Sequence, residues 1–178
     1  MRVAVTDGMA KEAVKKLENA GCDVIQEFIE HNDLVNGALA EFDAVIVRSA
    51  TKLSEEMMQA SLPRLKVIAR AGVGVDNIDV DAASRLGLPV VNAPRASTQS
   101  VVELTIGHLL GSLRFIPRAD RSLRSGQWAK KELKGTELFG KRLGLIGFGR
   151  IAQGVAKVAQ AFGMEVHSYD PYLPLSVA

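Results

Sequence analysis

Short apolar runs alternate with amphipathic stretches along the chain, and this pattern predicts strands that alternate with helices. The run 44–47 is apolar at every position, as is typical of a parallel strand that is covered on both faces. We therefore predict an α/β fold with doubly wound parallel sheets. The expected strands are 3–5, 23–26, 44–47, 65–69, 89–91, 143–146 and 164–170. The expected helices are 11–20, a weak one ending near 40, 54–60, one from Asp79 or Asp81 to 86, and 151–162.

The pattern changes after Ser97, where a long and strongly apolar helix is expected. Ser100 to Glu103 has the pattern of a capping box, although Ser97 and Thr98 are alternative caps. Such an apolar helix is expected to bury most of its surface, and Pro117 is expected to kink or break it. A basic stripe follows at helical spacing, formed by Arg114, Arg118, Arg121 and Arg124.

Composition narrows the possible partners and the location. The net charge is +2 and aromatic residues are only 5% of the chain, so the basic stripe is interpreted as a solvated or subunit-facing helix, and no nucleic-acid partner is expected. The single cysteine, Cys22, excludes an internal disulfide and fits a reducing compartment. The chain enters a strand directly at its start and has no apolar run of membrane-spanning length. We expect a cytoplasmic protein without a membrane partner.

A glycine-rich turn between a strand and a helix predicts a dinucleotide site. Gly147 and Gly149 precede the helix, and Ala152 takes the place of the third glycine. Asp170 follows about twenty residues later, where a carboxylate can accept hydrogen bonds from an adenosine ribose. A carboxylate there favours NAD over NADP, whereas Arg150 could accept a 2′-phosphate but is better placed for the pyrophosphate.

Three polar or glycine-rich stretches follow predicted strands, at the sheet edge where ligands bind in open α/β sheets. They are 48–51, 70–77 and 92–94. Arg48 can pair with a carboxylate or a phosphate, and Ser49 can donate a hydrogen bond. From these residues alone, a surface ion pair, a tight connection and an ordinary turn remain alternative interpretations of the three stretches.

Taken together, these stretches resemble the D-isomer-specific 2-hydroxyacid dehydrogenase family, in the family's order and over essentially the whole chain. The residues that carry the resemblance are 47–51, 70–79, 92–94, 100–103, 126–128, 147–152 and 169–171. The amino-acid sequence at 48–51 and 70–77 is more similar to the branch of the family that acts on 3-phosphoglycerate than to the glyoxylate and lactate reductases. The resemblance implies a flavodoxin-like substrate domain over residues 1–94, followed by the first part of a Rossmann NAD-binding domain over residues 95–178.

The resemblance also implies a role for individual residues. Arg48 and Ser49 would contact a phosphorylated hydroxy acid, the backbone of Gly72, Val73 and Gly74 would bind its carboxylate, and Asn92 would line the same cleft. On the NAD side, the implied contacts are Val73 and Thr98 at the nicotinamide, Gly147, Gly149, Arg150 and Ile151 at the pyrophosphate, and Asp170 at the ribose. The implied reaction is the NAD-dependent oxidation of 3-phospho-D-glycerate to 3-phosphohydroxypyruvate, the entry step of serine biosynthesis.

In one respect the chain departs from the family. The family's catalytic Arg, Glu and His lie beyond the position of Ala178, and none of His31, His108 and His167 corresponds to them. We therefore expect an N-terminal fragment of such an enzyme that is inactive by itself. The alternatives are an NAD-binding sensor or corepressor-like module, a remnant that cannot fold alone, and another 2-hydroxyacid dehydrogenase such as a glyoxylate reductase. A homodimer or higher homo-oligomer is expected from the resemblance only.

Overall fold

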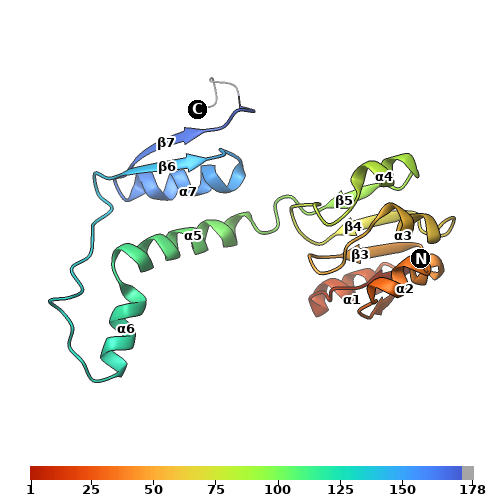
Figure 1. Ribbon diagram of the computed structural model, residues 1–178, viewed down its shortest axis with the longest axis horizontal. Helices are drawn as coiled ribbons and strands as arrows, with labels where there is room; N and C mark the ends of the chain where they lie inside the picture. The colour runs from red at the N-terminus through yellow and green to blue at the C-terminus, as the bar shows by residue number, and fades with distance from the viewer. Residues whose placement is uncertain (174–178) are drawn as a thin grey trace. The chain divides into compact units, whose positions relative to one another are not determined.

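The computed structural model describes residues 1–173 of a chain that divides into two compact units. The first unit comprises residues 1–96, and the second begins at Ser97. Each unit has its own parallel sheet (Figure 1). Each also has its own apolar clusters. Within residues 1–173, no helix combines the length and the apolar character needed to cross a bilayer.

The first unit contains a five-stranded sheet in which all neighbouring strands are parallel. Its strand order is β2-β1-β3-β4-β5, the flavodoxin-like order. The strands are β1 (Arg2–Val5), β2 (Asp23–Gln26), β3 (Ala44–Val47), β4 (Val67–Arg70) and β5 (Val90–Asn92). The predicted parallel α/β architecture is thereby confirmed.

Apolar side chains cover both faces of this sheet, because alternate residues of β1 and β3 point to opposite sides. On one face, Val45 and Val47 belong to the larger cluster, together with Met58. On the other face, Val3 and Val5 form a smaller cluster against which Cys22 packs. The connecting helices are α1 (Lys11–Asn19), α2 (His31–Val35), the 3₁₀ helix η1 (Ala38–Glu41), α3 (Glu55–Ala60) and α4 (Val80–Arg85).

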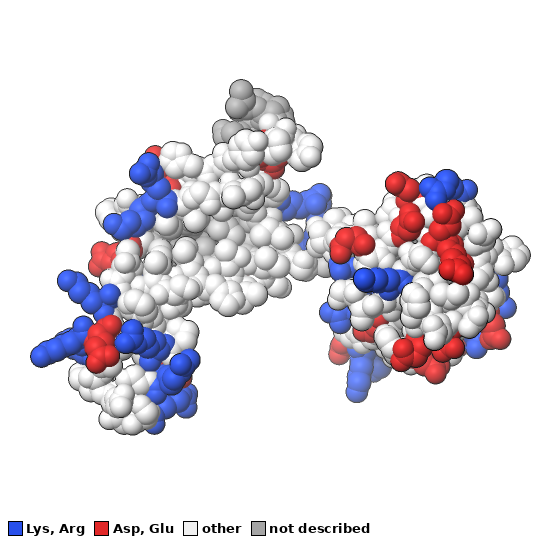
Figure 2. All heavy atoms as spheres, in the orientation of Figure 1, with Lys and Arg blue, Asp and Glu red and all other residues white. Residues whose placement is uncertain are grey.

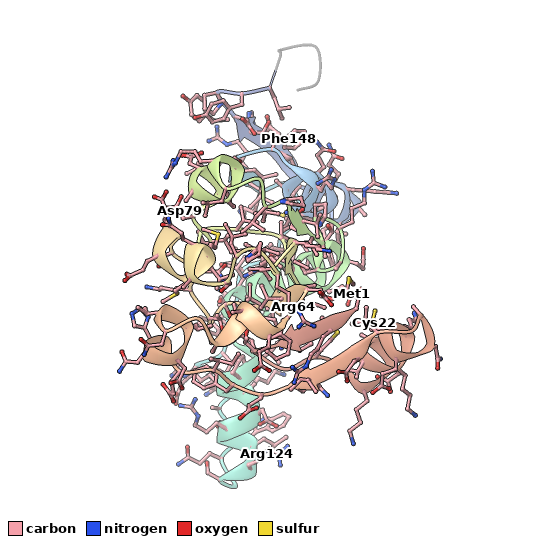
Figure 3. All side chains as sticks on the ribbon, turned by 90° about the vertical axis from the view of Figure 1, so that its right-hand side faces the viewer. Met1, Cys22, Arg64, Asp79, Arg124 and Phe148 are labelled. Atoms are coloured by element: carbon pink, nitrogen blue, oxygen red, sulfur yellow. The ribbon has the colours of Figure 1, made fainter. Side chains whose placement is uncertain are left out.

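Cys22, the single cysteine of the chain, is half-buried. It lies beside Met1 at the start of β2 (Figure 3), where the Asp23 N–H donates to the Met1 carbonyl at 2.9 Å. Its packing against the smaller cluster is that of a small apolar side chain.

Two helices of the first unit begin after residues of capping type, but only one of the two side chains forms a cap. Asp79 Oδ1 accepts a hydrogen bond from the Ala82 N–H at 2.9 Å at the start of α4. Ser54 precedes α3 as predicted, yet its side chain makes no capping hydrogen bond.

This difference gives a matched pair of substitutions. Asp79→Ala is expected to lower the free energy of unfolding by about 0.5–2 kcal/mol, because the Ala82 N–H loses its acceptor. Ser54→Ala should change it by only about 0.5 kcal/mol or less, since no capping bond is lost. Urea denaturation of both variants measures the difference, and equal effects would contradict the assigned cap.

The second unit contains a two-stranded parallel sheet that packs against two helices. Its elements are α5 (Thr98–Leu113), α6 (Ile116–Arg124), β6 (Arg142–Ile146), α7 (Arg150–Ala161) and β7 (Glu165–Tyr169). Val102 and Ile106 of α5 form an apolar cluster with Val155 of α7, and Leu143 and Leu145 of β6 pack against this cluster.

Of the alternative caps of the long apolar helix, Ser97 is the N-cap of α5, although its side chain makes no capping hydrogen bond. Ser100 lies inside α5, so no capping box forms there. The expected burial of this helix is wrong. Among the described residues, only Val102 and Ile106 of α5 are buried, and Leu104 is 60% exposed. The reason is that α5 packs against α7 and β6 with one face, while its apolar residues surround the whole helix.

The expected break near Pro117 is present. Helix α5 ends at Leu113, Phe115 adopts a left-handed backbone conformation with φ 54°, and Pro117 lies in the first turn of α6. Proline is tolerated there because the first-turn N–H has no partner within the helix. Gly126, with φ 77°, follows the end of α6.

Candidate functional site

The predicted substrate-binding stretches of the first unit lie at one edge of its sheet. The strand order reverses between β1 and β3, and ligands of open α/β sheets bind at the carboxyl ends of strands near such a reversal. In the strand register, Val47 is opposite Arg70, and Arg70 is opposite Asn92. Arg48, the glycine-rich loop after Arg70, and Asn92 therefore occupy the same edge on three adjacent strands.

Side chains from two other loops hold the stretch Arg48–Thr51. Asp7, which follows β1, accepts hydrogen bonds from the N–H groups of Arg48 and Thr51 at 2.6 and 3.1 Å. The Thr51 hydroxyl lies 2.5 Å from Asp7 Oδ1 and 2.8 Å from the Thr6 hydroxyl. Asn77 Nδ2 donates to the carbonyls of Arg48 and Thr51 at 2.8 and 2.6 Å. Arg48 and Ser49 themselves are exposed.

The carboxylate of Asp7 is held in its ionised form. Partial burial raises its pKa, but the hydrogen bonds from Thr51 and from the Arg48 and Ala50 backbone outweigh burial and lower the pKa below 3.8. A carboxylate at the carboxyl end of β1 is therefore a stable acceptor for the loop that follows β3.

Acidification is expected to destabilise the first unit in part through Asp7. Its pKa is lower in the folded chain than in the unfolded chain, so the unfolded state binds more protons below about pH 5. The stabilisation is complete above the unfolded-state pKa and is lost as the pH falls through the folded-state pKa. Denaturation of wild type and Asp7→Asn between about pH 2 and pH 7 should give a stability difference that shrinks on acidification. A pH-independent difference would contradict the assignment.

The glycine-rich loop after β4 makes close contacts with its neighbours. The Gly72 N–H donates to the Arg70 carbonyl at 2.8 Å, and the Gly72 carbonyl accepts from the Ala93 N–H at 2.9 Å. A Cβ atom on Gly72 would overlap the Arg70 guanidinium, so a larger residue at this position would have to displace the Arg70 side chain. Asn92 Nδ2 donates to the Val73 carbonyl at 2.6 Å. Because the Gly72 N–H is already engaged, the N–H groups of Val73 and Gly74 are the better candidates for binding a carboxylate.

Three residues at this edge were not singled out from the sequence: Asp7, and also Arg70 and Asn77, which lie within the predicted stretch 70–77. Asp7 follows β1, and the carboxyl ends of strands are where ligand-binding residues gather in open α/β sheets, so its position was a usable signal. Asn77 is separated from Arg48 by 29 positions, so its contact with that residue leaves no local pattern. Arg70 is half-buried and its Nε has no hydrogen-bond partner among residues 1–173.

The predicted dinucleotide turn lies between β6 and α7 in the second unit. Gly147 has φ 83°, a conformation that favours glycine, and its N–H donates to the Tyr169 carbonyl at 2.7 Å. Gly149 is the N-cap of α7, where no side chain caps the helix. A Cβ on Gly147 or Gly149 would meet no atom within 4 Å. No side chain caps the N–H groups at the start of α7, and space is open beside both glycines, which suits a phosphate-binding helix start.

Asp170 adjoins this turn. Its Oδ2 accepts from the Phe148 N–H at 2.8 Å, and its Oδ1 accepts from the Tyr172 N–H at 2.9 Å. The Phe148 bond first, and then the Tyr172 bond, lower the pKa of Asp170 below 3.8 against a smaller opposing effect of desolvation. Each carboxylate oxygen has a second lone pair, so the group can still accept hydrogen bonds from a ribose. The turn, the uncapped helix and Asp170 together fit a dinucleotide.

The remaining predicted cofactor residues are divided between the two units. Val73, 37% exposed, lies in the glycine-rich loop of the first unit, and Thr98 begins α5 in the second. Arg150 is exposed at the first position of α7. Ile151 packs its side chain against the Val102–Val155 cluster, so only its backbone can face a ligand.

The basic stripe is partly neutralised within the second unit. Lys and Arg side chains gather around α6 (Figure 2), but Arg124 pairs with Asp120 at 3.0 Å and Arg118 pairs with Glu132 at 3.3 Å. All three histidines are exposed, and His167 pairs with Glu165 at 2.8 Å. No cluster within residues 1–173 has enough suitable side chains to hold a metal ion.

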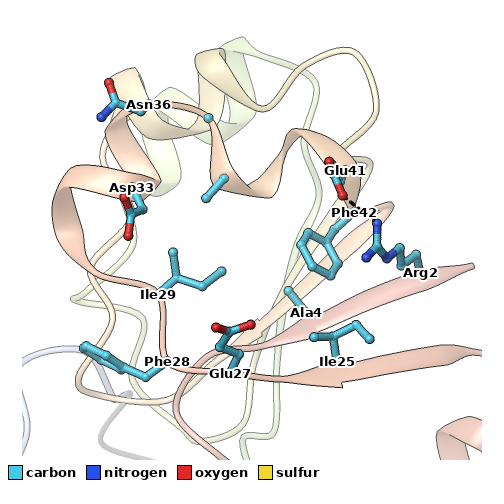
Figure 4. A pocket seen from close by; sticks show the side chains of 12 residues that line it. Arg2, Ala4, Ile25, Glu27, Phe28, Ile29, Asp33, Asn36, Glu41 and Phe42 are labelled. Carbon is cyan, nitrogen blue, oxygen red and sulfur yellow. Dashed lines mark hydrogen bonds and ion pairs between the residues drawn. The ribbon is translucent and has the colours of Figure 1, made fainter.

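Two cavities of the first unit flank β2. One, of about 390 Å³, includes Asp7, Gly8 and Ala50 and therefore borders the predicted site. The other, of about 510 Å³, has an apolar floor that includes Ile25 and Ile29, and the Arg2–Glu41 ion pair lies on its wall (Figure 4). None of the predicted substrate-binding residues lines this second cavity.

Comparison with known proteins agrees with this geometry. Residues 3–169 match the family described as D-isomer specific 2-hydroxyacid dehydrogenase, catalytic domain. D-3-phosphoglycerate dehydrogenase of Methanocaldococcus jannaschii is 47% identical over 178 residues, which are 100% of this chain and 34% of that protein. Hydroxypyruvate reductase of Thermotoga maritima is 49% identical over 174 residues, which are 97% of this chain and 56% of that protein.

A solved structure gives the same result. The crystal structure of cofactor (NAD⁺)-bound 3-phosphoglycerate dehydrogenase from Entamoeba histolytica has a TM-score of 0.77 at 34% identity, covering 98% of this chain and 55% of that chain. The chain thus spans roughly one third to slightly more than half of the length of these relatives. Its fold, its glycine turn and the family match over residues 3–169 show that the chain belongs to the D-isomer specific 2-hydroxyacid dehydrogenase family.

Proposed function

We propose that the protein takes part in the NAD-dependent oxidation of 3-phospho-D-glycerate to 3-phosphohydroxypyruvate, the entry step of serine biosynthesis. The observation that carries the proposal is the single sheet edge shared by Arg48, the Gly72–Gly74 loop and Asn92. Residues 1–94 would form the substrate-binding part and residues 95–178 the start of the NAD-binding part. The 47% identity to a D-3-phosphoglycerate dehydrogenase over the whole chain supports this substrate.

The substrate has an anionic group at each end, and the edge offers a different binding group for each. The Arg48 guanidinium and the Ser49 hydroxyl would bind the phosphate, because a guanidinium can form two parallel hydrogen bonds to its oxygens. The N–H groups of Val73 and Gly74 would bind the carboxylate. Asn92 would hold the second loop in place through its bond to the Val73 carbonyl.

The second unit would bind NAD along the turn between β6 and α7. The N–H groups of Arg150 and Ile151 would hold the pyrophosphate with the favourable end of the α7 dipole, and Asp170 would accept from the adenosine ribose. An ionised Asp170 would repel a 2′-phosphate, which favours NAD over NADP. Thr98, at the start of α5, would border the nicotinamide, and bound NAD supplies the acceptor for the hydride from C2.

The described residues bind and orient, and none of them is proposed as the general base. His31, His108 and His167 are exposed; His31 begins α2, away from the edge that carries Arg48 and Asn92, and the other two belong to the second unit. We therefore expect the 178-residue chain to bind NAD and substrate without turnover. An NAD-responsive module without catalysis would use the same binding site. In binding experiments it would give the same result as an inactive part of a dehydrogenase.

A second candidate substrate is an unphosphorylated hydroxy acid. The relative named hydroxypyruvate reductase is 49% identical and shares a larger part of its length with this chain. In that case the same edge would bind the carboxylate, and Arg48 would have no phosphate to bind.

Titration of the chain with 3-phospho-D-glycerate and with D-glycerate, followed by NMR, separates the two candidates. We expect wild type to bind the phosphorylated acid more tightly, and Arg48→Gln to weaken that binding by about tenfold or more while sparing D-glycerate. Arg64→Gln removes an exposed arginine that pairs with Asp43 elsewhere in the same unit and is the matched control. Equal affinity of wild type for the two acids would instead support the unphosphorylated substrate.

A further inference from the structure

Two side chains satisfy the backbone polar groups at both ends of the stretch Arg48–Thr51. The N–H groups of Arg48 and Thr51 donate to Asp7 Oδ2 at 2.6 and 3.1 Å. The carbonyls of the same two residues accept from Asn77 Nδ2 at 2.8 and 2.6 Å. We call these two residues, Asp7 and Asn77, the loop clamp.

Each position of the clamp has a specific chemical requirement. An ionised Asp7 is a pure acceptor and can face several donors at once, whereas asparagine would place an NH₂ group among N–H groups. Asn77 must place its nitrogen between two carbonyl oxygens, and an aspartate there would direct an oxygen at both. Among residues 1–173, Asn77 Oδ1 is buried without a hydrogen-bond partner, whereas Nδ2 makes two bonds.

Asn77 also connects the two parts of the proposed substrate site. Its own carbonyl accepts from the Leu53 N–H at 2.9 Å, and it follows the Gly72–Gly74 loop by only a few residues. The clamp therefore joins the loop after β3 to the loop after β4. A substrate with a phosphate at one end and a carboxylate at the other needs these two loops at a fixed separation.

The side chains of the clamped stretch are left available for a ligand. Arg48 and Ser49 are exposed, and within residues 1–173 neither side chain makes a hydrogen bond or an ion pair. By contrast, the Thr51 side chain is buried and directed at Asp7. The clamp thus fixes the backbone while leaving the anion-binding groups free.

We infer that Asp7 and Asn77 are positioning residues that hold Arg48 and Ser49 at the place of the substrate phosphate, and that the clamp thereby sets the preference for phosphorylated over unphosphorylated hydroxy acids. This inference rests on the proposed function. Fixing a charged donor in advance reduces the entropy lost on binding, so a loosened loop binds the phosphate less tightly even though Arg48 is still present. The proposed carboxylate contacts, the N–H groups of Val73 and Gly74, lie outside the stretch Arg48–Thr51, so we expect them to be affected less.

The test measures the ratio of affinities for 3-phospho-D-glycerate and D-glycerate in near-isosteric variants of the full chain. Asn77→Asp and Asp7→Asn are each expected to weaken binding of the phosphorylated acid by about tenfold and to change D-glycerate binding by no more than about twofold. The matched controls are Asn32→Asp and Asp33→Asn on α2, which are exposed and should leave the ratio unchanged. NMR spectra of the free variants report whether the fold is retained.

Thr51→Val is a milder variant for the case in which a clamp variant does not fold. It keeps the buried shape and removes only the hydroxyl that contacts Asp7, so a smaller loss of about threefold in the ratio is expected. Folded variants that keep the wild-type ratio, while Arg48→Gln abolishes it, would overturn the inference and leave the proposed function intact. A wild-type chain that does not distinguish the two acids would overturn both.

Discussion

Replacement of Gly154 by valine is expected to destabilise the second unit more than any other single change considered for this protein. A Cβ on Gly154 would lie 2.6 Å from Val102 Cγ2, at the contact between α7 and α5. Val102 is only 3% exposed, and its β-branched side chain has few alternative rotamers within a helix. Overpacking of this kind costs about 1–3 kcal/mol, and the additional valine methyl groups place the effect at the upper end of that range. Thermal unfolding followed by circular dichroism measures the loss.

A compensating substitution and a control make this prediction specific to the helix contact. Gly154→Ala places a single methyl group at the same contact and should also destabilise the unit. Adding Val102→Ala to Gly154→Ala should recover much of that loss, because the new methyl group occupies the space that the valine side chain leaves. Gly107→Ala lies in the middle of α5, where a Cβ meets nothing within 4 Å, and should stabilise the unit by about 0.5–1 kcal/mol. Similar destabilisation by Gly107→Ala and Gly154→Ala would mean that the close contact is not the cause.

Asp170→Ala is expected to weaken NAD binding by about tenfold to a hundredfold. The substitution removes the proposed ribose acceptor and also releases the Phe148 N–H, which Asp170 holds within the glycine turn. It also removes the negative charge that disfavours a 2′-phosphate, so the preference for NAD over NADP should narrow. Calorimetric titration with the two cofactors measures both effects.

Asp120→Ala is the matched control for this variant. Asp120 is an exposed carboxylate of the same unit that pairs with Arg124 on α6, and it has no proposed contact with a cofactor. Its loss should leave NAD affinity unchanged. If both variants weakened NAD binding equally, the effect would come from net charge rather than from the ribose contact.

Local patterns were enough to predict most of the fold, because the β–α alternation leaves a strong periodic signal. The apolar run Ala44–Val47 and the strand–turn–helix around Gly147 were predicted at the positions where the structure has them. The strand predicted from Leu65 begins instead at Val67, since the Leu65 N–H bonds to the Ser61 carbonyl rather than to a neighbouring strand. Hydrophobicity alone could not show that difference.

The exposure of α5 and the clamp residues could not be predicted, for two separate reasons. An all-round apolar helix indicates burial, but within residues 1–173 only one face of α5 has neighbours to pack against. The contacts of Asp7 with Arg48 and of Asn77 with Arg48 span 41 and 29 positions and depend on strand order. A single sequence contains no periodic signal for pairs at such separations, whereas Arg48, the glycine loop and Asn92 each adjoin a predicted strand.

Calorimetric titration of the 178-residue chain with NAD, in parallel with NADP, tests the central claim most directly. Saturable binding of NAD, with weaker binding of NADP, is the result expected from the open start of α7 and the ionised Asp170. A folded chain that binds neither cofactor, or that binds NADP more tightly than NAD, would contradict the proposed cofactor site.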